Sequence, residues 1–123
     1  MKKRVLNAQR LRKVPAQFSW VDHRLVQEHY FTRCDHAAWA LYLFLSCVAD
    51  VQGLSYYSDA SLMRRLNMEA GPFSASRQQL IRVGLIAYEK PLYQVLSLET
   101  ADAPRSGSIS VAQLMRQALG GAS

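Results

Sequence analysis

The sequence predicts one mainly α-helical domain that carries a small antiparallel sheet. Three stretches lead to this fold class. An almost wholly apolar run at 36–50 predicts a buried helix, and 59–83 has the pattern of two short helices joined by a tight turn. Two extended runs, 85–89 and 92–98, are separated by Lys90-Pro91 and predict a hairpin. A chain of 123 residues has room for one modest core and some appendages.

The apolar run at 36–50 is expected to form the centre of the domain. Asp35 can cap its first turn, and its apolar residues would lie on nearly every side of the helix: Trp39, Leu41, Tyr42, Leu43, Phe44, Leu45 and Val48. The run is well short of the ~20 apolar residues that span a bilayer, so no membrane partner is expected. Neighbouring helices or a second copy of the chain must cover this surface, which leaves a homodimer open.

The stretch 59–66 predicts a short helix with one apolar face. Ser58 or Asp59 can cap its start, and Asn67 tolerates the left-handed backbone that ends a helix. The apolar residues recur at spacings that place them on one side: Leu62, Met63 and Leu66.

A second helix is predicted over 72–83. Pro72 suits a first turn, because its missing N–H is harmless there, and Gly84 is expected to end the helix. Phe73, Leu80 and Val83 form the expected buried stripe. Together with 59–66, this helix makes a helix-turn-helix.

A third short strand is predicted at 54–57, so the expected order is helix, strand, helix, helix, strand, strand. The segment SLMRRLNM, followed by Phe73, Leu80 and Gly84-Leu85-Ile86, resembles the winged helix-turn-helix domains of bacterial DNA-binding proteins, over about 35–98. The resemblance implies duplex DNA as the partner and 72–83 as the helix that reads it. More faintly, the chain resembles small winged-helix proteins encoded beside transposase or plasmid replication genes in bacteria.

The basic charge of the chain is concentrated at its start. The formal net charge is +6, and residues 1–13 hold six basic residues and no acidic one, whereas nine basic and nine acidic residues follow. We therefore expect 1–17 to be a basic arm that lies along DNA phosphates or enters a minor groove, although a solvated tail is the alternative. Its basic residues are Lys2, Lys3, Arg4, Arg10, Arg12 and Lys13.

The candidate reading residues are those that point away from the buried stripe of 72–83. They are Ser74, Ala75, Gln78, Gln79 and Arg82, with Arg77 at the boundary. Gln can make paired hydrogen bonds to adenine and Arg to guanine, while Ser and Ala fit near a thymine methyl or a phosphate. Arg64, Arg65 and Lys90 are candidates for backbone contacts. Glu69 and Glu89 oppose DNA binding at the edges of this surface.

Two further segments extend the winged fold. An extra N-terminal helix is expected within 18–33, with Trp20 or Val21, Leu25 and Val26 toward the core, so the domain would run over 18–98. A linker at 99–108 leads to an appended amphipathic helix at 109–119, which would dock on its own domain or on another protein.

No motif of catalysis, phosphate binding or metal binding occurs in the sequence, so we expect no enzyme, cofactor or metal. Cys47 should be a buried small hydrophobe, and two cysteines with no secretory leader favour the cytoplasm. The leading hypothesis is a small transcriptional regulator, or a mobile-element or plasmid accessory factor. The alternative is a winged-helix module that docks on a transposase or replication protein. Single-strand binding by Tyr56, Tyr57, Tyr88 and Tyr93 is less economical, because these fit the sheet and core.

Overall fold

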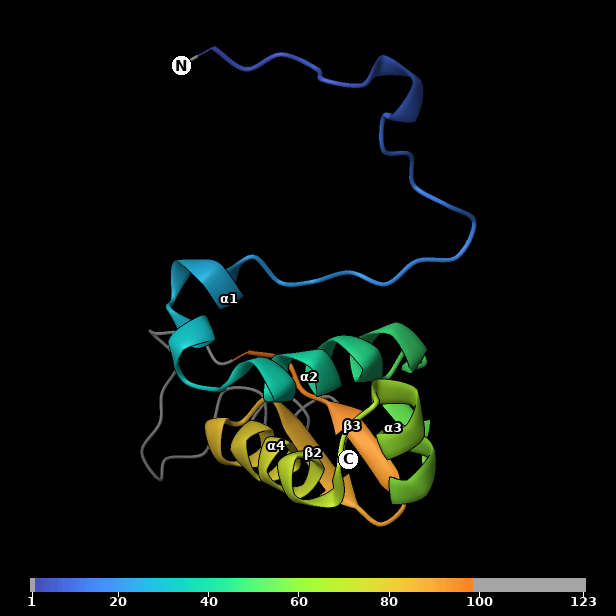
Figure 1. Ribbon diagram of the computed structural model, residues 1–123, viewed down its shortest axis with the longest axis vertical. Coiled ribbons are helices and arrows are strands. Elements are labelled where there is room, and N and C mark those ends of the chain that lie inside the picture. The colour runs from blue at the N-terminus through green and yellow to red at the C-terminus, as the bar shows by residue number, and fades with distance from the viewer. Residues whose placement is uncertain (1, 99–123) are drawn as a thin grey trace, which may run out of the picture.

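The computed structural model describes residues 2–98, and the predicted linker 99–108 and helix 109–119 lie outside them. The predicted order of helix, strand, helix, helix, strand, strand is confirmed. Helix α2 lies between the N-terminal segment on one side and helix α4 with the sheet on the other (Figure 1). These elements are α2 (His36–Val48), β1 (Leu54–Tyr56), α3 (Asp59–Leu66), α4 (Ala70–Val83), β2 (Ile86–Glu89) and β3 (Leu92–Val95).

Helix α2 begins at the predicted cap and presents one face to the core. Asp35 Oδ1 accepts a hydrogen bond from the Ala38 N–H at 2.9 Å. The helix stops two residues before the predicted end, because the backbone becomes extended at Ala49. Leu43 is 57% exposed, and Cys47, one turn further on the same face, is also exposed. The expectation that Cys47 is buried is therefore wrong.

The turn between α3 and α4 follows the local signals closely. The Ser58 hydroxyl accepts from the Ser61 N–H at 3.1 Å, and Asn67 adopts the left-handed conformation at φ 54°. Helix α4 begins at Ala70, two residues before the prediction. Pro72 thereby becomes its third residue, where the N–H has no partner within the helix in any case. Gly84, at φ 87°, ends α4 as predicted.

The sheet has the order β1-β3-β2, with both pairs antiparallel. In this register Tyr93 of the central strand lies opposite Ser55 on one side and Tyr88 on the other. Gly53 precedes β1 at φ 87°, and a Cβ there would lie 2.6 Å from the Val95 carbonyl oxygen, so only glycine fits this close approach. Strand β3 ends at Val95, three residues before the prediction.

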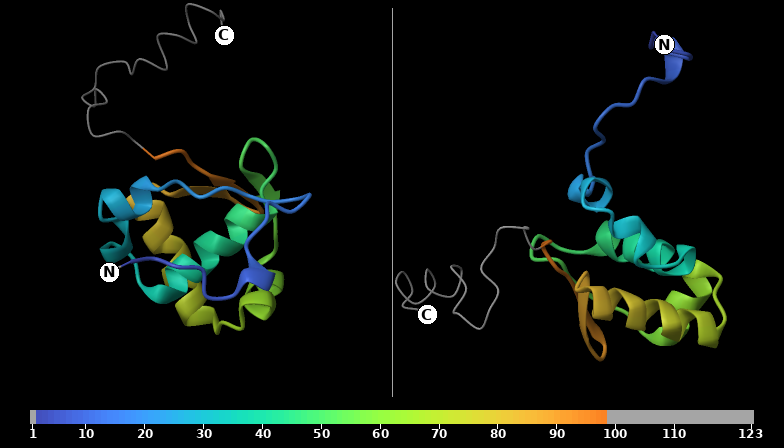
Figure 2. Two further views of the ribbon diagram at one scale, coloured as in Figure 1. Left: turned by 90° about the horizontal axis from the view of Figure 1, so that it is seen from above. Right: turned by 90° about the vertical axis from the view of Figure 1, so that its left-hand side faces the viewer.

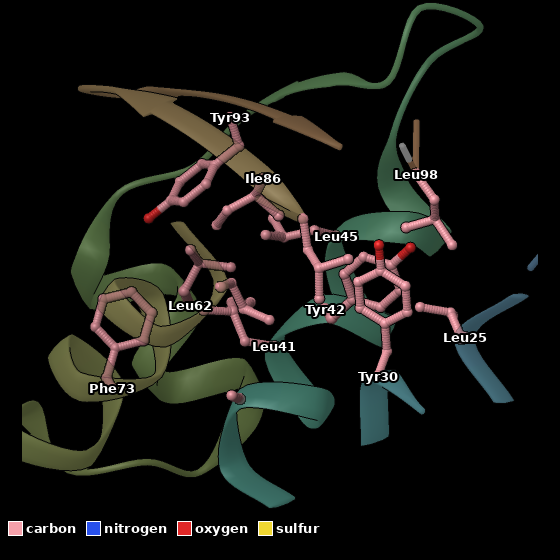
Figure 3. Packing of buried hydrophobic residues seen from close by; sticks show 13 residues of the cluster. Leu25, Tyr30, Leu41, Tyr42, Leu45, Leu62, Phe73, Ile86, Tyr93 and Leu98 are labelled. Atoms are coloured by element: carbon pink, nitrogen blue, oxygen red, sulfur yellow. The ribbon is translucent and has the colours of Figure 1, made fainter. Parts of the chain in front are cut away.

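The core joins the helices to strands β2 and β3 (Figure 3). Leu41 and Leu45 of α2 meet the single buried residue of α3, Leu62, and the inner faces of α4 and the sheet. Because α2, α3, α4 and both of these strands contribute, the relative placement of α3 and α4 is fixed by packing. The largest fully buried side chains are Tyr93, Phe73, Leu41, Leu45, Leu62, Leu80, Leu85 and Ile86.

The predicted helix within 18–33 is wrong in extent. The structure has a single turn, α1 (Arg24–Gln27), and a 3-10 turn, η2 (Tyr30–Thr32). His29 separates them with a left-handed backbone at φ 61°, which a continuous helix does not admit. Of the residues expected to face the core, Leu25 is buried, whereas Trp20, Val21 and Val26 are exposed. Tyr30 is buried as well.

Candidate nucleic-acid interface

Helix α4 has one buried face and one exposed face. Phe73, Ser76 and Leu80 are buried, and the Ser76 hydroxyl donates to the Pro72 carbonyl at 2.8 Å, so this serine is satisfied within the helix. The opposite face agrees with the outward orientation predicted from the sequence. Its exposed residues include the predicted Ser74, Ala75, Gln78 and Arg82, together with Gly71 and Ile81.

Arg77 lies on one flank of this exposed face and is occupied within the fold. Its Nη1 donates to Asp59 Oδ1 and to the Tyr93 hydroxyl, each at 2.8 Å. Its guanidinium also lies 4.2 Å from the centre of the Tyr88 ring. The side chain is only 13% exposed. Arg77 therefore fastens α4 to α3 and to the sheet, and its contact with DNA stays a prediction.

Gln79 lies on the other flank and is also occupied. Its Nε2 donates to Asp35 Oδ2 at 2.9 Å, and its Oε1 accepts from the Asp35 N–H at 2.8 Å. The first of these bonds is the main cause that lowers the pKa of Asp35. Gln79 thus joins the middle of α4 to the start of α2, and its contact with DNA stays a prediction.

The predicted backbone-contact residues are all exposed. Arg64 and Arg65 lie in the last turn of α3, and Lys90 lies at the tip of the hairpin between β2 and β3. Arg65 Nε donates to the Ser61 hydroxyl at 3.3 Å, so its position on α3 is partly fixed. Glu69, the residue before α4, is exposed as well and accepts no capping hydrogen bond with its side chain.

The arm leaves the domain on the side of α1, across α2 from α4 (Figures 1 and 2). All of residues 2–13 are exposed, and a short 3-10 turn, η1 (Ala8–Arg10), is capped by Asn7. The exposed face of α4 and the arm therefore start from opposite sides of α2. The sequence predicted both surfaces but not this separation.

One exposed arginine was not among the sequence candidates. Arg33 lies between η2 and α2, and its Nη2 donates to the Glu28 carbonyl at 3.0 Å. Its guanidinium lies 4.1 Å from the centre of the Tyr30 ring. Because the sequence placed Arg33 within a continuous helix, no local signal distinguished it from an ordinary solvated side chain.

A shallow groove lies away from α4, between the segment 16–24, the C-terminal end of α2 and residues 94–98. Phe18 and Trp20 line it and are 67% and 76% exposed. Asp22 and Arg24, which also line it, form an ion pair at 2.7 Å.

Within residues 2–98, no group of three or more His, Cys, Asp or Glu side chains is placed to hold a metal ion. In the same part of the chain, no helix has both the length and the apolar character that crossing a bilayer requires. No family model, curated protein or solved structure gives a significant match to this chain.

Proposed function

We propose that this chain is a winged helix-turn-helix protein that binds duplex DNA and reads it with α4. The order of elements and the three-stranded antiparallel sheet support the fold. One observation supports the function above all. The exposed face of α4 carries Ser74, Gln78 and Arg82, while the two polar residues that flank this face, Arg77 and Gln79, are both engaged inside the fold.

The chemistry of this face suits the edges of base pairs. An α-helix fits the ~12 Å width of the major groove, where each base pair presents a distinct pattern of donors and acceptors. Gln78 can exchange paired hydrogen bonds with adenine, and Arg82 can donate two to guanine. Ser74 and Ala75 are small enough to let the backbone of α4 come close to the bases.

Affinity in this proposal comes mainly from the arm. Beyond residue 13 the basic and acidic residues balance, so the folded part supplies little net attraction for phosphates. The arm starts across α2 from α4, but the ten residues 14–23 span about 33–36 Å when extended. In this proposal the segment lets the basic residues meet phosphates of the same duplex that α4 reads. Arg64, Arg65 and Lys90 add backbone contacts on the other side.

The resemblance to bacterial winged-helix proteins favours a small transcriptional regulator, or an accessory factor of a mobile element or plasmid. Either role requires preference for particular DNA sites, which phosphate contacts alone do not provide. Pairing with a second copy of the chain stays a prediction from the apolar character of α2.

The proposal is tested by selecting bound duplexes from a random pool with the full chain. We expect the wild type to enrich a defined motif, and the double variant Gln78→Ala with Arg82→Ala to bind the pool without enriching it. Arg64→Ala is the matched control, since loss of a phosphate contact should weaken binding to all sequences alike. Enrichment of the same motif by the double variant would refute base reading by α4.

A second candidate function is contact with another protein, as suggested by the exposed aromatic residues of the groove. Phe18 and Trp20 are large apolar side chains left in water, a feature of surfaces that bind partners. The resemblance suggests a transposase or replication protein as the partner. A full chain that shifts no duplex at moderate salt, yet co-purifies with such a protein through Trp20, would favour this function over DNA reading.

A further inference from the structure

Arg33 is an exposed arginine whose guanidinium is held in place by its surroundings. One of its nitrogens donates to the Glu28 carbonyl, and the group stacks over Tyr30, which is itself buried. An arginine has five N–H donors, so most of them stay free for a ligand. Because the side chain is already ordered, binding would cost less conformational entropy than for a mobile surface arginine.

The structure also places Arg33 beside the C-terminal half of α4. Asp35, two residues later, shares two hydrogen bonds with Gln79, and Arg82 lies one helical turn beyond Gln79. Cys34 lies between Arg33 and Asp35 in the chain. Burial and the Asp35 carboxylate raise the pKa of its thiol, whereas the positive charges of Arg82 and Arg33 act in the opposite direction.

The nearby acidic group is turned away from this position. Asp35 directs Oδ1 to the Ala38 N–H and Oδ2 to Gln79 Nε2, so both carboxylate oxygens are engaged with the fold. Both oxygens of this carboxylate are therefore taken, and the exposed Arg33 keeps donors that Asp35 does not occupy.

We propose that Arg33 binds a backbone phosphate of the duplex, next to the base pair that Arg82 contacts. This inference rests on the proposed reading role of α4. A helix lying in the major groove has a phosphate strand along each side, and Arg33 is placed to meet the strand on the α2 side. The carbonyl and the ring that hold the guanidinium come from Glu28, the residue after α1, and from Tyr30 of η2, so these turns would position Arg33. Arg33 would thereby add a second cation to Arg82 on the side from which the arm departs.

The test measures the affinity of the full chain for one fixed duplex over a range of KCl concentrations. We expect Arg33→Gln to weaken binding to all sequences and to lower the log–log salt slope by about 0.9, the amount expected for one phosphate contact. Arg33→Lys should keep the slope, because the charge remains. Arg24→Gln is the matched control: it removes the same charge, but Arg24 is already paired with Asp22.

An unchanged slope in Arg33→Gln would overturn the inference, and so would an equal loss in Arg24→Gln, which would show a general effect of net charge. Failure of the proposed function gives a different result. If Gln78→Ala with Arg82→Ala keeps the wild-type sequence preference while Arg33→Gln loses slope, DNA binds near Arg33 but α4 does not read it. If the wild type binds no duplex at all, both conclusions fall.

Discussion

The Nη1 atom of Arg77 lies 2.8 Å from Oδ1 of Asp59, the first residue of α3. The same nitrogen donates to the buried Tyr93 hydroxyl in the central strand. One guanidinium therefore joins α3, α4 and the sheet, and it does so on the flank of α4 beside the exposed face. The angle at which α4 is presented depends on this contact as well as on apolar packing. Arg77 is thus a positioning residue for the proposed reading surface.

Replacing Arg77 with Ala should destabilise the domain measurably. The Tyr93 hydroxyl would lose its partner in a buried position, and the cost should be about 1–3 kcal/mol, the usual cost of leaving a buried polar group unsatisfied. Arg82→Ala is the control on the same helix, because its side chain is exposed and its removal should change stability by less than ~0.5 kcal/mol. Urea denaturation of both variants, followed by circular dichroism, gives the comparison. If the two variants have the same free energy of unfolding, the Arg77 contacts make no net contribution to stability.

Acid should weaken the link between α3 and α4. The hydrogen bond from Arg77 is the main cause that lowers the pKa of Asp59 from its ordinary value of 3.8. A carboxyl group whose pKa is lowered by folding stabilises the fold fully above its unfolded pKa, and this contribution is lost as the pH falls toward the folded pKa. We therefore expect the free energy of unfolding to decrease as the pH is lowered below about 4.

The variant Asp59→Asn isolates that contribution. Its free energy of unfolding should be lower than that of the wild type near neutral pH, and the difference should shrink as the pH falls below the ordinary Asp value. Asp22 and Asp35 also have lowered pKa values, so some acid sensitivity will persist in the variant. Denaturation curves at several pH values measure the difference. A gap that stays constant with pH would contradict the assignment to Asp59.

The helix caps and helix ends that the sequence predicted correctly are those set by residues close by in the chain. The caps at Asp35 and Ser58, the left-handed Asn67 and the end at Gly84 depend on neighbours a few residues away, and all four are confirmed. The buried stripe of α4 followed from helical spacing, since Phe73 and Leu80 are fully buried and Val83 is partly so.

What the sequence did not reveal depends on distant partners. Helical projection puts Gln79 on the polar side and Arg77 at its boundary, but their partners Asp35 and Asp59 are 44 and 18 residues away. The predicted helix over 18–33 failed because the left-handed backbone at His29 interrupts a pattern that is locally helical. Such long-range or conformational determinants leave no periodic trace in a single sequence.

Gln78 and Gln79 are adjacent, yet they should give opposite results when replaced by Ala. Gln79→Ala should cost about 1–2 kcal/mol of stability, because the Asp35 N–H and carboxylate lose their partner, while sequence preference on DNA is kept. Gln78→Ala should leave stability within ~0.5 kcal/mol and reduce discrimination at one base pair by about 1–3 kcal/mol. Thermal denaturation together with competition binding on matched and mismatched duplexes measures both effects. The same outcome for both variants would contradict the assignment of only one of them to DNA.

Removal of residues 2–13 should reduce the salt dependence of DNA binding more than any single substitution does. The segment carries six basic residues, all exposed, so its loss should lower the log–log salt slope by as much as ~5 if each residue meets a phosphate. The motif selected by α4 should stay the same, because the arm supplies attraction rather than base reading. A chain in which Lys2, Lys3, Arg4, Arg10, Arg12 and Lys13 are all changed to Gln is the control that keeps the length of the arm. If this chain retains the wild-type slope, the arm does not touch phosphates and serves only as a solvated tail.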